Sequence, residues 1–357
     1  MSYPSPVDLQ SLSKEKVAAN FESIPFAPED RLTPAAAKKL FSELPTSCAI
    51  SVCSFIYSEE FYKRACTSLS TQFGSRKEEH GHSFKRLFFE VRVPDLLQET
   101  MTLSRAIAEN IFTLKLSACP TDFPLNDVCS QLPNLNHLVV KYESSSISRA
   151  SLESIPRALH VSSNLVSLTL QDSFLTDDDV ATLFESGSAN STILNLSLAH
   201  NNITSTGLAV VVEKFLATPA SVLCSLDVMG NKICSDGGSV LGKSLAENES
   251  LLSLNLRLNY LDDIGGSALL DSLVSNTTLK YLNLSGNNLA SRSANALVNV
   301  LESNDKLSLG AVIITSNPFI EEDEEAIKSC DRCYVDMRGG SSPGRQDMFL
   351  GESLMPY

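Results

Sequence analysis

Aliphatic residues recur through the second half of the chain in the pattern L-x-x-L-x-L-x-x-N-x-L. Clear copies begin at positions 193, 223, 251, 279 and 309, and looser copies begin at 111, 135 and 165. From position 135 on, neighbouring copies start 28 or 30 residues apart. A fixed period of this length indicates a solenoid, in which about eight repeats bury their leucines by stacking on one another.

Each repeat is expected to combine a strand with a helix. Side chains alternate along a strand, so both leucines of L-x-L point to the same, buried side. The Asn that follows can bond backbone groups of the adjoining turn and form a ladder through the interior. Apolar residues then recur at helical spacing, as in 209–216, 267–274 and 293–301. The unit resembles the ribonuclease-inhibitor-type leucine-rich repeat. We therefore predict an α/β fold, a leucine-rich-repeat solenoid of horseshoe form with a small N-terminal helical cap domain.

The pattern divides the chain into four regions. We expect an extended arm over 1–31, a helical domain over 32–108, the leucine-rich-repeat domain over 109–335 and a flexible tail over 336–357. In the helical domain, Thr33 and Pro34 are typical of an N-cap and a first helical residue, which predicts a helix that ends near position 44. Further helices are predicted over 49–56, from Ser58 to Cys66 and over about 94–109.

The charge is unevenly distributed. Net charge is −14, yet residues 1–105 hold 13 basic and 13 acidic residues, so the excess of acid lies in the repeats. Such a surface disfavours nucleic acid and anionic lipid, and its partners should be basic or neutral proteins. No apolar run of 18 residues exists, and the beginning of the sequence lacks signal-peptide features. With nine scattered cysteines as well, we expect a cytosolic protein without disulfides or a membrane span.

The side chains between the ladder leucines should face the concave side of the sheet. This face is small, polar and weakly charged, and it includes Asp227, Asn255 and Asn283. One interpretation is a solvated sheet face with few contacts. The other is a protein-binding face with Arg257 and Tyr281 as anchors, since these residue types dominate binding hot spots.

One stretch matches the phosphate-binding pattern G-x4-G-K-S, namely residues 237–244. That loop must follow a buried strand and precede a helix. Here the match falls inside the helical half of a repeat, and Gly237 and Gly238 correspond to Gly265 and Gly266 of the next repeat. We therefore expect helix packing in place of nucleotide binding, and no cofactor.

Three other motifs resemble chemical sites, but each is better explained as a structural feature. Cys330 and Cys333 form a single C-x-x-C without a second ligand pair, so a zinc site is not expected. His80 and His82 are accompanied by cationic side chains, which repel a metal ion. The acidic run over 321–325 fits the first turn of a capping helix. No catalytic constellation is found, and we predict a protein that is not an enzyme and takes no small-molecule substrate.

The region in front of the repeats carries a more specific resemblance. The order is E-L-P at 43–45, then E-E-F-Y-K-R-A-C at 59–66, then G-H-S-F-K-R-L-F-F-E at 81–90, followed by the repeats. This order resembles the t-complex-associated testis-expressed 1 family, which is subunit 5 of the nexin-dynein regulatory complex. The resemblance covers roughly residues 40–335. Phe84 stands where the family has a Trp.

The resemblance implies a structural subunit of the ciliary or flagellar axoneme, located in the link between doublet microtubules. Implied partners are other subunits of the nexin-dynein regulatory complex, with indirect association to microtubules and dynein. Phe84, Lys85 and Arg86 of the neutral front domain are candidate docking residues, although Phe84 can equally pack the domain and the two cations can be solvated or salt-bridged. Two alternatives remain: a Ran-type GTPase activator, which shares the repeat type, and a soluble enzyme inhibitor.

Overall fold

The computed structural model describes ten stretches of the chain, which form two compact units. The stretches are 59–69, 83–99, 101–120, 123–142, 149–162, 164–184, 192–218, 220–303, 306–330 and 332–337. The first unit holds the described residues up to Lys115 with Gln131–Asn134, and the second holds Leu116–Ser130 and those from Leu135 on. Several predicted features lie outside the described residues: the arm, the helices over 33–44 and 49–56, His80, His82 and the tail beyond position 337.

The first unit is built on two packed helices, α4 (Glu59–Leu69) and α5 (Phe84–Glu99), followed by the short α6 (Arg105–Ala108). Aromatic rings join them: the centroid of the Tyr62 ring lies 5.5 Å from that of Phe88 and 5.9 Å from that of Phe89. All three side chains are fully buried. Because aromatic side chains bury more apolar area than most others, this cluster is the core of the unit.

The helix predicted over about 94–109 is wrong in its bounds. α5 begins at Phe84 and continues through Pro94, and only the separate turn of α6 falls in the later part of the predicted stretch. A proline removes an amide donor and usually interrupts a helix. Here Val93 and Leu97, on both sides of the proline, are fully buried. Tertiary packing of these side chains therefore holds the helix together across Pro94.

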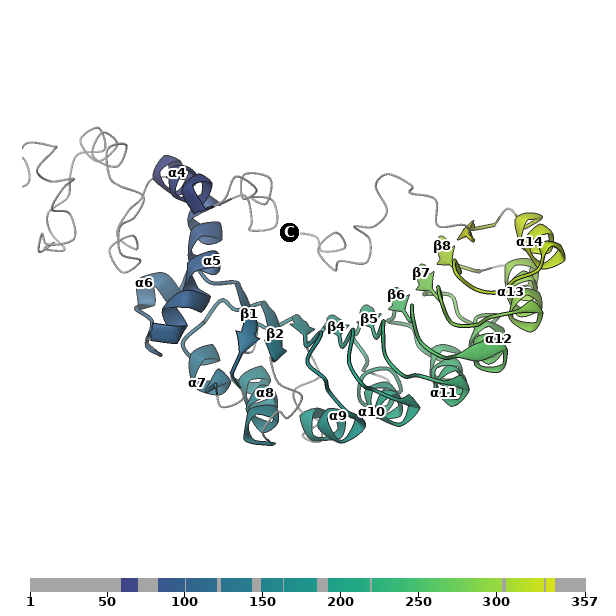
Figure 1. Ribbon diagram of the computed structural model, residues 1–357, viewed down its shortest axis with the longest axis horizontal. Coiled ribbons are helices and arrows are strands. Elements are labelled where there is room, and N and C mark those ends of the chain that lie inside the picture. Colours follow the sequence, from purple (N-terminus) through teal and green to yellow (C-terminus); the bar gives the residue numbers. More distant parts are fainter. Residues whose placement is uncertain are drawn as a thin grey trace, which may run out of the picture. The chain divides into compact units, whose positions relative to one another are not determined.

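The second unit carries a parallel sheet covered on one side by helices. Within the described residues the sheet has nine strands in sequence order, β1 (Thr113–Cys119), β2 (His137–Tyr142), β3 (Ser167–Thr169), β4 (Asn195–Ser197), β5 (Ser225–Asp227), β6 (Ser253–Asn255), β7 (Tyr281–Asn283), β8 (Ala311–Ile313) and β9 (Tyr334–Asp336). The first three residues of β1 are counted with the first unit. The helices between the strands are α7 (Leu125–Cys129), α8 (Arg149–Val161), α9 (Asp177–Phe184), α10 (Ser205–Phe215), α11 (Ser235–Leu245), α12 (Asp262–Ser272), α13 (Ser291–Ser303) and α14 (Glu321–Lys328). The strands line the inner side of this unit, and the helices lie outside them (Figure 1).

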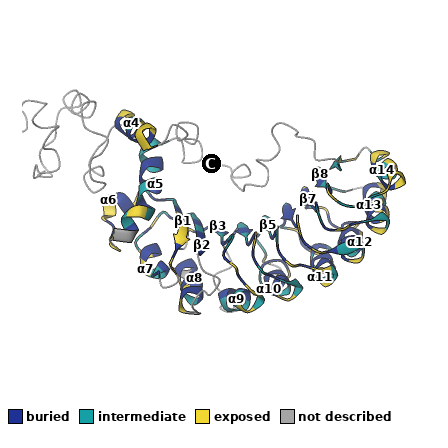
Figure 2. Cartoon of the chain, in the orientation of Figure 1, coloured by how far each residue is buried: buried dark blue, intermediate teal, exposed yellow. Residues whose placement is uncertain are grey.

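The strand register confirms the predicted repeat. The second residues of neighbouring strands are partners, so Leu168, Leu196, Leu226, Leu254, Leu282 and Val312 form one row. These side chains lie at or below 2% exposure. The strands that carry them, β3 to β8, consist of buried and intermediate residues (Figure 2). A ninth strand, β9, continues the row with Val335. It was not predicted, because the unit after α14 is short and lacks the L-x-L pattern.

The predicted asparagine ladder is also confirmed. The side-chain amide of each ladder Asn donates to three backbone carbonyls, two of its own repeat and one of the preceding repeat. Asn231 Nδ2, for example, lies 3.0 Å from the Val228 oxygen and 2.9 Å from the Leu198 oxygen, and its Oδ1 accepts from the Ile203 amide. Asn201, Asn259, Asn287 and Asn317 bond in the same way. The ladder thus satisfies polar backbone groups that the turns leave buried.

A second asparagine ladder occupies the turn at the other end of the helices. Asn276 donates to the Leu245 and Asn248 carbonyls, and its Oδ1 accepts from the Leu279 amide at 2.9 Å. Asn248 repeats these contacts one unit earlier, to the Leu216 carbonyl and from the Leu251 amide. Sequence reasoning missed this ladder, although Asn-x-x-Leu recurs there at a spacing of 28 residues.

Candidate protein-interaction surfaces

The inner sheet face consists of the first and third residues of strands β3–β8 and the residue two positions after each strand. Asp227, Asn255 and Asn283 occupy the third place in three consecutive strands. Each side-chain oxygen accepts a hydrogen bond from the amide two residues later, at 3.0 Å, 3.1 Å and 3.0 Å, respectively. These three predicted binding residues therefore hold the ends of their own strands, as Asx turns do.

The two predicted anchors differ in accessibility. Arg257 is exposed, so its guanidinium is available to a partner. Tyr281 is only 6% exposed. Its neighbours in register are Ser253 and Ala311, so no large side chain flanks it on the sheet. Tyr281 thus offers a partner little surface, and Arg257 is the accessible member of the pair.

Asp227 is partly buried on this face. Burial raises the pKa of Asp227, although the Met229 amide, His200 and Asn255 favour its charged form. Its carboxylate is the one acidic group on the inner sheet face, as Arg257 is the one cation. The face therefore offers short polar groups and almost no net charge.

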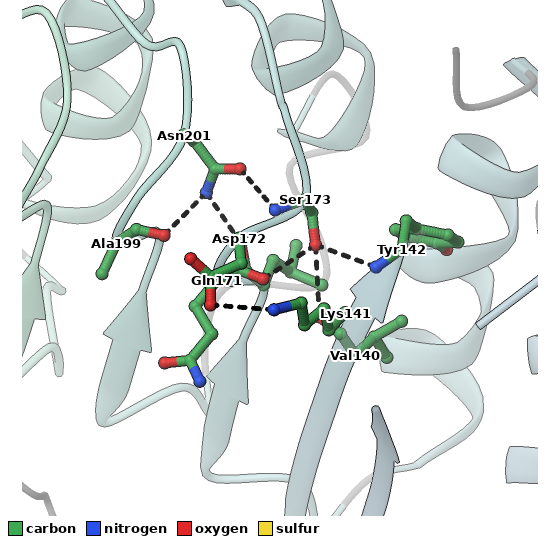
Figure 3. A network of polar contacts seen from close by, with 9 residues as sticks. Val140, Lys141, Tyr142, Gln171, Asp172, Ser173, Ala199 and Asn201 are labelled. Carbon is green, nitrogen blue, oxygen red and sulfur yellow. Dashed lines mark hydrogen bonds and ion pairs between the residues drawn. The ribbon is translucent and has the colours of Figure 1, made fainter. Parts of the chain in front are cut away.

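A hollow lies at the ends of β2 and β3 in the second unit. It has a volume of about 650 Å³ and is lined by Ser117, Lys141, Tyr142, Asp172, Phe174 and His200. Lys141 and Asp172 form an ion pair across it, with 3.2 Å between Nζ and Oδ2 (Figure 3). Burial raises the pKa of Tyr142, so its phenol stays neutral near pH 7. Because the two charges neutralise each other and both side chains are about half exposed, the hollow suits a polar contact.

The local backbone explains this hollow. Ser173 stands in the place of the ladder Asn, and its hydroxyl is bonded with the Tyr142 amide at 3.2 Å and the Gln171 carbonyl at 3.0 Å (Figure 3). Asp172 and Phe174, on both sides of it, have positive φ angles of 50° and 57°. Non-glycine residues rarely adopt this conformation. The sequence signal for this local difference is Ser173 itself, which stands where the following repeats have Asn.

The candidate docking residues of the first unit are engaged within that unit. Arg86 Nε lies 2.9 Å from Glu90 Oε1, and its guanidinium lies 4.3 Å from the centre of the Phe112 ring. The same carboxylate oxygen accepts from the Phe112 and Thr113 amides. Because the Glu90 side chain is only 2% exposed, Arg86 is its neutralising partner. The alternative of a salt-bridged Arg86 is thus the one observed.

Phe84 and Lys85 begin α5 beside the start of α4. Glu59 Oε2 accepts from the Phe84 amide at 2.7 Å, so α4 caps α5. Phe84 and Lys85 are both partly buried, and Lys85 Nζ lies 6.0 Å from the centre of the Tyr62 ring. Burial lowers the pKa of Lys85, while Glu59 opposes that shift. These side chains therefore support the helix pair, with part of each still open to solvent.

The G-x4-G-K-S match lies within α11, as predicted. Its glycines serve helix packing: a methyl group on Gly238 would overlap the Gly265 carbonyl oxygen of α12, and one on Gly242 would lie 2.8 Å from the Ala268 oxygen. Close approach of two backbones is a common reason for glycine in a helix. A phosphate needs free amides at a helix start, but the Gly237 amide already donates to the Cys234 carbonyl and the Ser205 hydroxyl, and the Gly238 amide donates to the Cys234 carbonyl.

The other chemical motifs are likewise structural where the structure describes them. The acidic run begins α14, with four acidic residues in its first turn. Burial raises the pKa of Cys333 to about 11, with Cys330 adding to the shift, and burial raises the pKa of Cys129 to about 12. Such thiols are protonated near pH 7 and are poor nucleophiles. Across the described stretches, no three His, Cys, Asp or Glu side chains gather as metal ligands, and no helix is long and apolar enough to cross a bilayer.

A match to a known family agrees with this architecture. A family model described as Leucine Rich repeat matches residues 189–212, 247–270 and 275–298. No curated protein matches the chain. Among solved structures, a leucine-rich-repeat protein of Leptospira interrogans is 18% identical with a TM-score of 0.39, over 66% of this chain and 58% of that one. An internalin of Listeria monocytogenes is 17% identical with a TM-score of 0.36, over 71% of this chain and 88% of that one. With its parallel strands, alternating helices and asparagine ladder, the chain is a leucine-rich-repeat solenoid.

Proposed function

We propose that this protein is a structural subunit of the axonemal nexin-dynein regulatory complex, in the link between doublet microtubules. At the coarser level, a leucine-rich-repeat solenoid is a protein-interaction scaffold, because its stacked repeats expose an extended sheet face and long edges. The candidate surfaces described above offer polar and charged side chains, such as Arg257, to a protein partner. The proposed neighbours are other subunits of that complex, which would connect the chain indirectly to microtubules and dynein.

The observation that carries the axonemal proposal is the pair of sequence blocks in front of the repeats. Residues 59–66 and 81–90 carry the resemblance to the t-complex-associated testis-expressed 1 family. Their described parts form α4 and the start of α5, with Phe61, Tyr62, Phe88 and Phe89 fully buried. The two blocks therefore build one helical core, which explains why they occur together ahead of a solenoid.

Imaging tests the proposal directly. A tagged copy of the chain, expressed in a ciliated or flagellated cell that lacks the endogenous protein, should appear along the axoneme and remain there after detergent removes the membrane. Crosslinking of isolated axonemes should join it to other subunits of the regulatory complex. Diffuse cytosolic staining together with an absence of such crosslinks would contradict the proposal.

Docking through the first unit can be tested with two charge reversals. Lys85→Glu changes a partly exposed cation and should weaken recruitment to axonemes that lack the protein. Arg86→Glu would instead place two carboxylates together beside Phe112, and we expect it to destabilise the unit. Thermal unfolding of both variants separates a lost contact from a lost fold, and normal recruitment of a stable Lys85→Glu variant would exclude Lys85 from docking.

A further inference from the structure

The segments that join each strand to the following helix form a continuous edge of the second unit. We call this the strand-to-helix edge and define it as residues 172–178, 200–206, 230–236, 258–264, 286–292 and 316–322. Each segment begins with a residue of positive φ, namely Asp172, His200, Gly230, Leu258, Gly286 and Ser316. The next residue points inward as the ladder Asn or Ser, so the backbone turns the same corner in every repeat.

Exposed apolar side chains are concentrated on this edge. Of the seven large hydrophobic residues that are exposed in the described part of the second unit, five belong to it. Tyr260 and Ile264 are the most exposed, at 62% and 58%. Leu258 lies beside them in the chain, in the positive-φ row between Gly230 and Gly286, and its side chain reaches over Gly286. A group of exposed apolar residues of this kind is typical of a protein-interaction site. The remaining two apolar residues of the edge are Phe174 and Ile320.

The edge is also acidic. It holds eight Asp and Glu residues and two basic residues, Lys232 and Arg292. Three of the acidic side chains, Asp177, Asp262 and Asp263, bond the neighbouring repeat. Within the described part of the chain, the others include four carboxylates that form no ion pair and face solvent: Asp178, Asp236, Glu321 and Glu322. Charge complementarity therefore favours a basic partner and disfavours nucleic acid and anionic lipid.

The length of the edge sets the size of that partner. From the segment after β3 to the segment after β8 there are five strand spacings, which span about 24 Å at ~4.8 Å each. A helix of about 16 residues has the same length. Apolar groups occur at both ends of this span, at Phe174 and Ile320, and in its middle, at Leu258, Tyr260 and Ile264. The strand-to-helix edge has this length, exposed apolar side chains and flanking carboxylates, and it therefore matches one face of an amphipathic helix.

We infer that the strand-to-helix edge binds a basic amphipathic helix of a partner protein. Apolar side chains of that helix pack on Leu258, Tyr260 and Ile264, and its Lys and Arg residues lie against Asp178, Asp236, Glu321 and Glu322. Lys232 and Arg292 belong to the segments on both sides of the central apolar group, and acidic residues of the partner can pair with them there. The inference deepens the proposed function by naming the chemistry of one neighbour, and it rests on the protein being a scaffold.

A defined peptide provides the test. The probe is a 16-residue helix of Leu and Lys, labelled with a fluorophore, with Leu at i, i+3, i+4 and i+7; one control peptide has Glu for Lys, and another has Ser for Leu. Fluorescence anisotropy with the full chain should show binding of the Lys–Leu peptide at least tenfold tighter than that of either control. Comparable binding of the Glu peptide would overturn the proposed charge complementarity.

Variants of the chain locate the site. Tyr260→Ser with Ile264→Ser should weaken binding at least tenfold, whereas Val274→Ser, an exposed apolar residue of the same repeat outside the edge, should leave it unchanged. Replacing Asp178, Asp236, Glu321 and Glu322 by their amides should also weaken binding and flatten its salt dependence. Circular dichroism and thermal unfolding verify that each variant is folded. The inference would be overturned if Val274→Ser weakened peptide binding as much as the edge variants do, or if neither set of edge variants weakened it.

The outcome is separable from that of the axonemal proposal. Peptide binding at the edge with no localisation to cilia would contradict the axonemal role alone. Localisation to the axoneme without peptide binding at the edge would contradict the present inference alone.

Discussion

The inner sheet face and the strand-to-helix edge belong to the same repeats, yet they use their polar residues differently. On the face, Asp227, Asn255 and Asn283 bond the backbone of their own strands, and net charge is close to zero. On the edge, carboxylates face solvent beside exposed apolar side chains such as Tyr260. A concave sheet is the usual first guess for a binding surface. In this molecule the edge has the stronger features of one.

The two regions also shift the pKa of a carboxylate in opposite directions. Burial raises the pKa of Asp227 on the face. Burial would raise the pKa of Asp263 on the edge too, but hydrogen bonds from the side chain and amide of Ser293 and from the amides of Ala290 and Arg292 outweigh it, and the pKa is lowered. A carboxylate surrounded by amide donors is stabilised in its charged form. The edge thus favours negative charge, whereas the face disfavours it.

The largest effect is expected beneath the edge, at the ladder. Asn259→Ala would remove the donor to the Val228 and Leu256 carbonyls and the acceptor for the Ile233 amide, leaving buried groups unsatisfied. We expect the free energy of unfolding to fall by about 3 kcal/mol. Urea denaturation measures this loss. Asn202→Ala, at a partly exposed position next to a ladder residue, is the matched control and should change stability by less than about 0.5 kcal/mol.

A smaller loss is expected for Asp263→Ala, because this side chain caps α13 from the neighbouring repeat. The free energy of unfolding should fall by about 1 kcal/mol at pH 7. A lowered folded pKa means that the stabilisation is present above the unfolded value of about 3.9 and is lost as pH falls through the folded value. The difference between wild type and variant should therefore shrink in acid. A difference that stays constant from pH 7 down to strongly acidic solution would show that the charge of Asp263 has no role.

Asp227→Asn should change the free energy of unfolding in the opposite direction. A raised folded pKa means that the side chain contributes most below about pH 3.9, and that this contribution is lost as pH rises through the folded value. Asn keeps the acceptor for the Met229 amide, as Asn255 and Asn283 do for the amides in their own strands. At pH 7 we expect a gain in stability of less than about 1 kcal/mol. A clear loss of stability at pH 7 in calorimetry would contradict the proposed difference between the face and the edge.

The smallest change in stability is expected for Arg257→Ala on the inner face. The side chain is exposed, so the free energy of unfolding should change by less than about 0.5 kcal/mol. This variant is therefore a clean probe of binding. If the inner face binds a subunit of the axonemal link, crosslinks to that subunit should fall in the variant while the melting temperature stays the same. Unchanged crosslinks would remove Arg257 as an anchor.

Much of the fold could be predicted because one period governs it. Every strand from β2 to β8 lies where the leucine pattern places it, since each buried row needs a Leu or Val at the same position in each unit. β9 was not predicted because only Val335 of the stretch Tyr334-Val335-Asp336 fits the leucine pattern. The path of α5 was not predicted because burial of Val93 and Leu97, on both sides of Pro94, holds the helix together against the local preference of proline.

The candidate sites were less predictable than the fold. Residue type identified Tyr281 as an anchor, but accessibility depends on packing that one sequence does not contain. Arg86 was recognised as a possible salt-bridge partner, while its partner Glu90 and the Phe112 ring only come together in the folded unit. The edge was overlooked because its exposed apolar residues occur in only three of its six segments, so no periodic signal marks them.

The ladder bonds that join each repeat to the one before it have a mechanical consequence. Because every unit is fastened mainly to its neighbours, a pulling force applied along the stack should detach units from an end, one after another. A unit of 28 residues would release roughly 95 Å of chain at about 3.4 Å per residue. A protein placed under tension could therefore extend in discrete steps and shorten again when the load is removed.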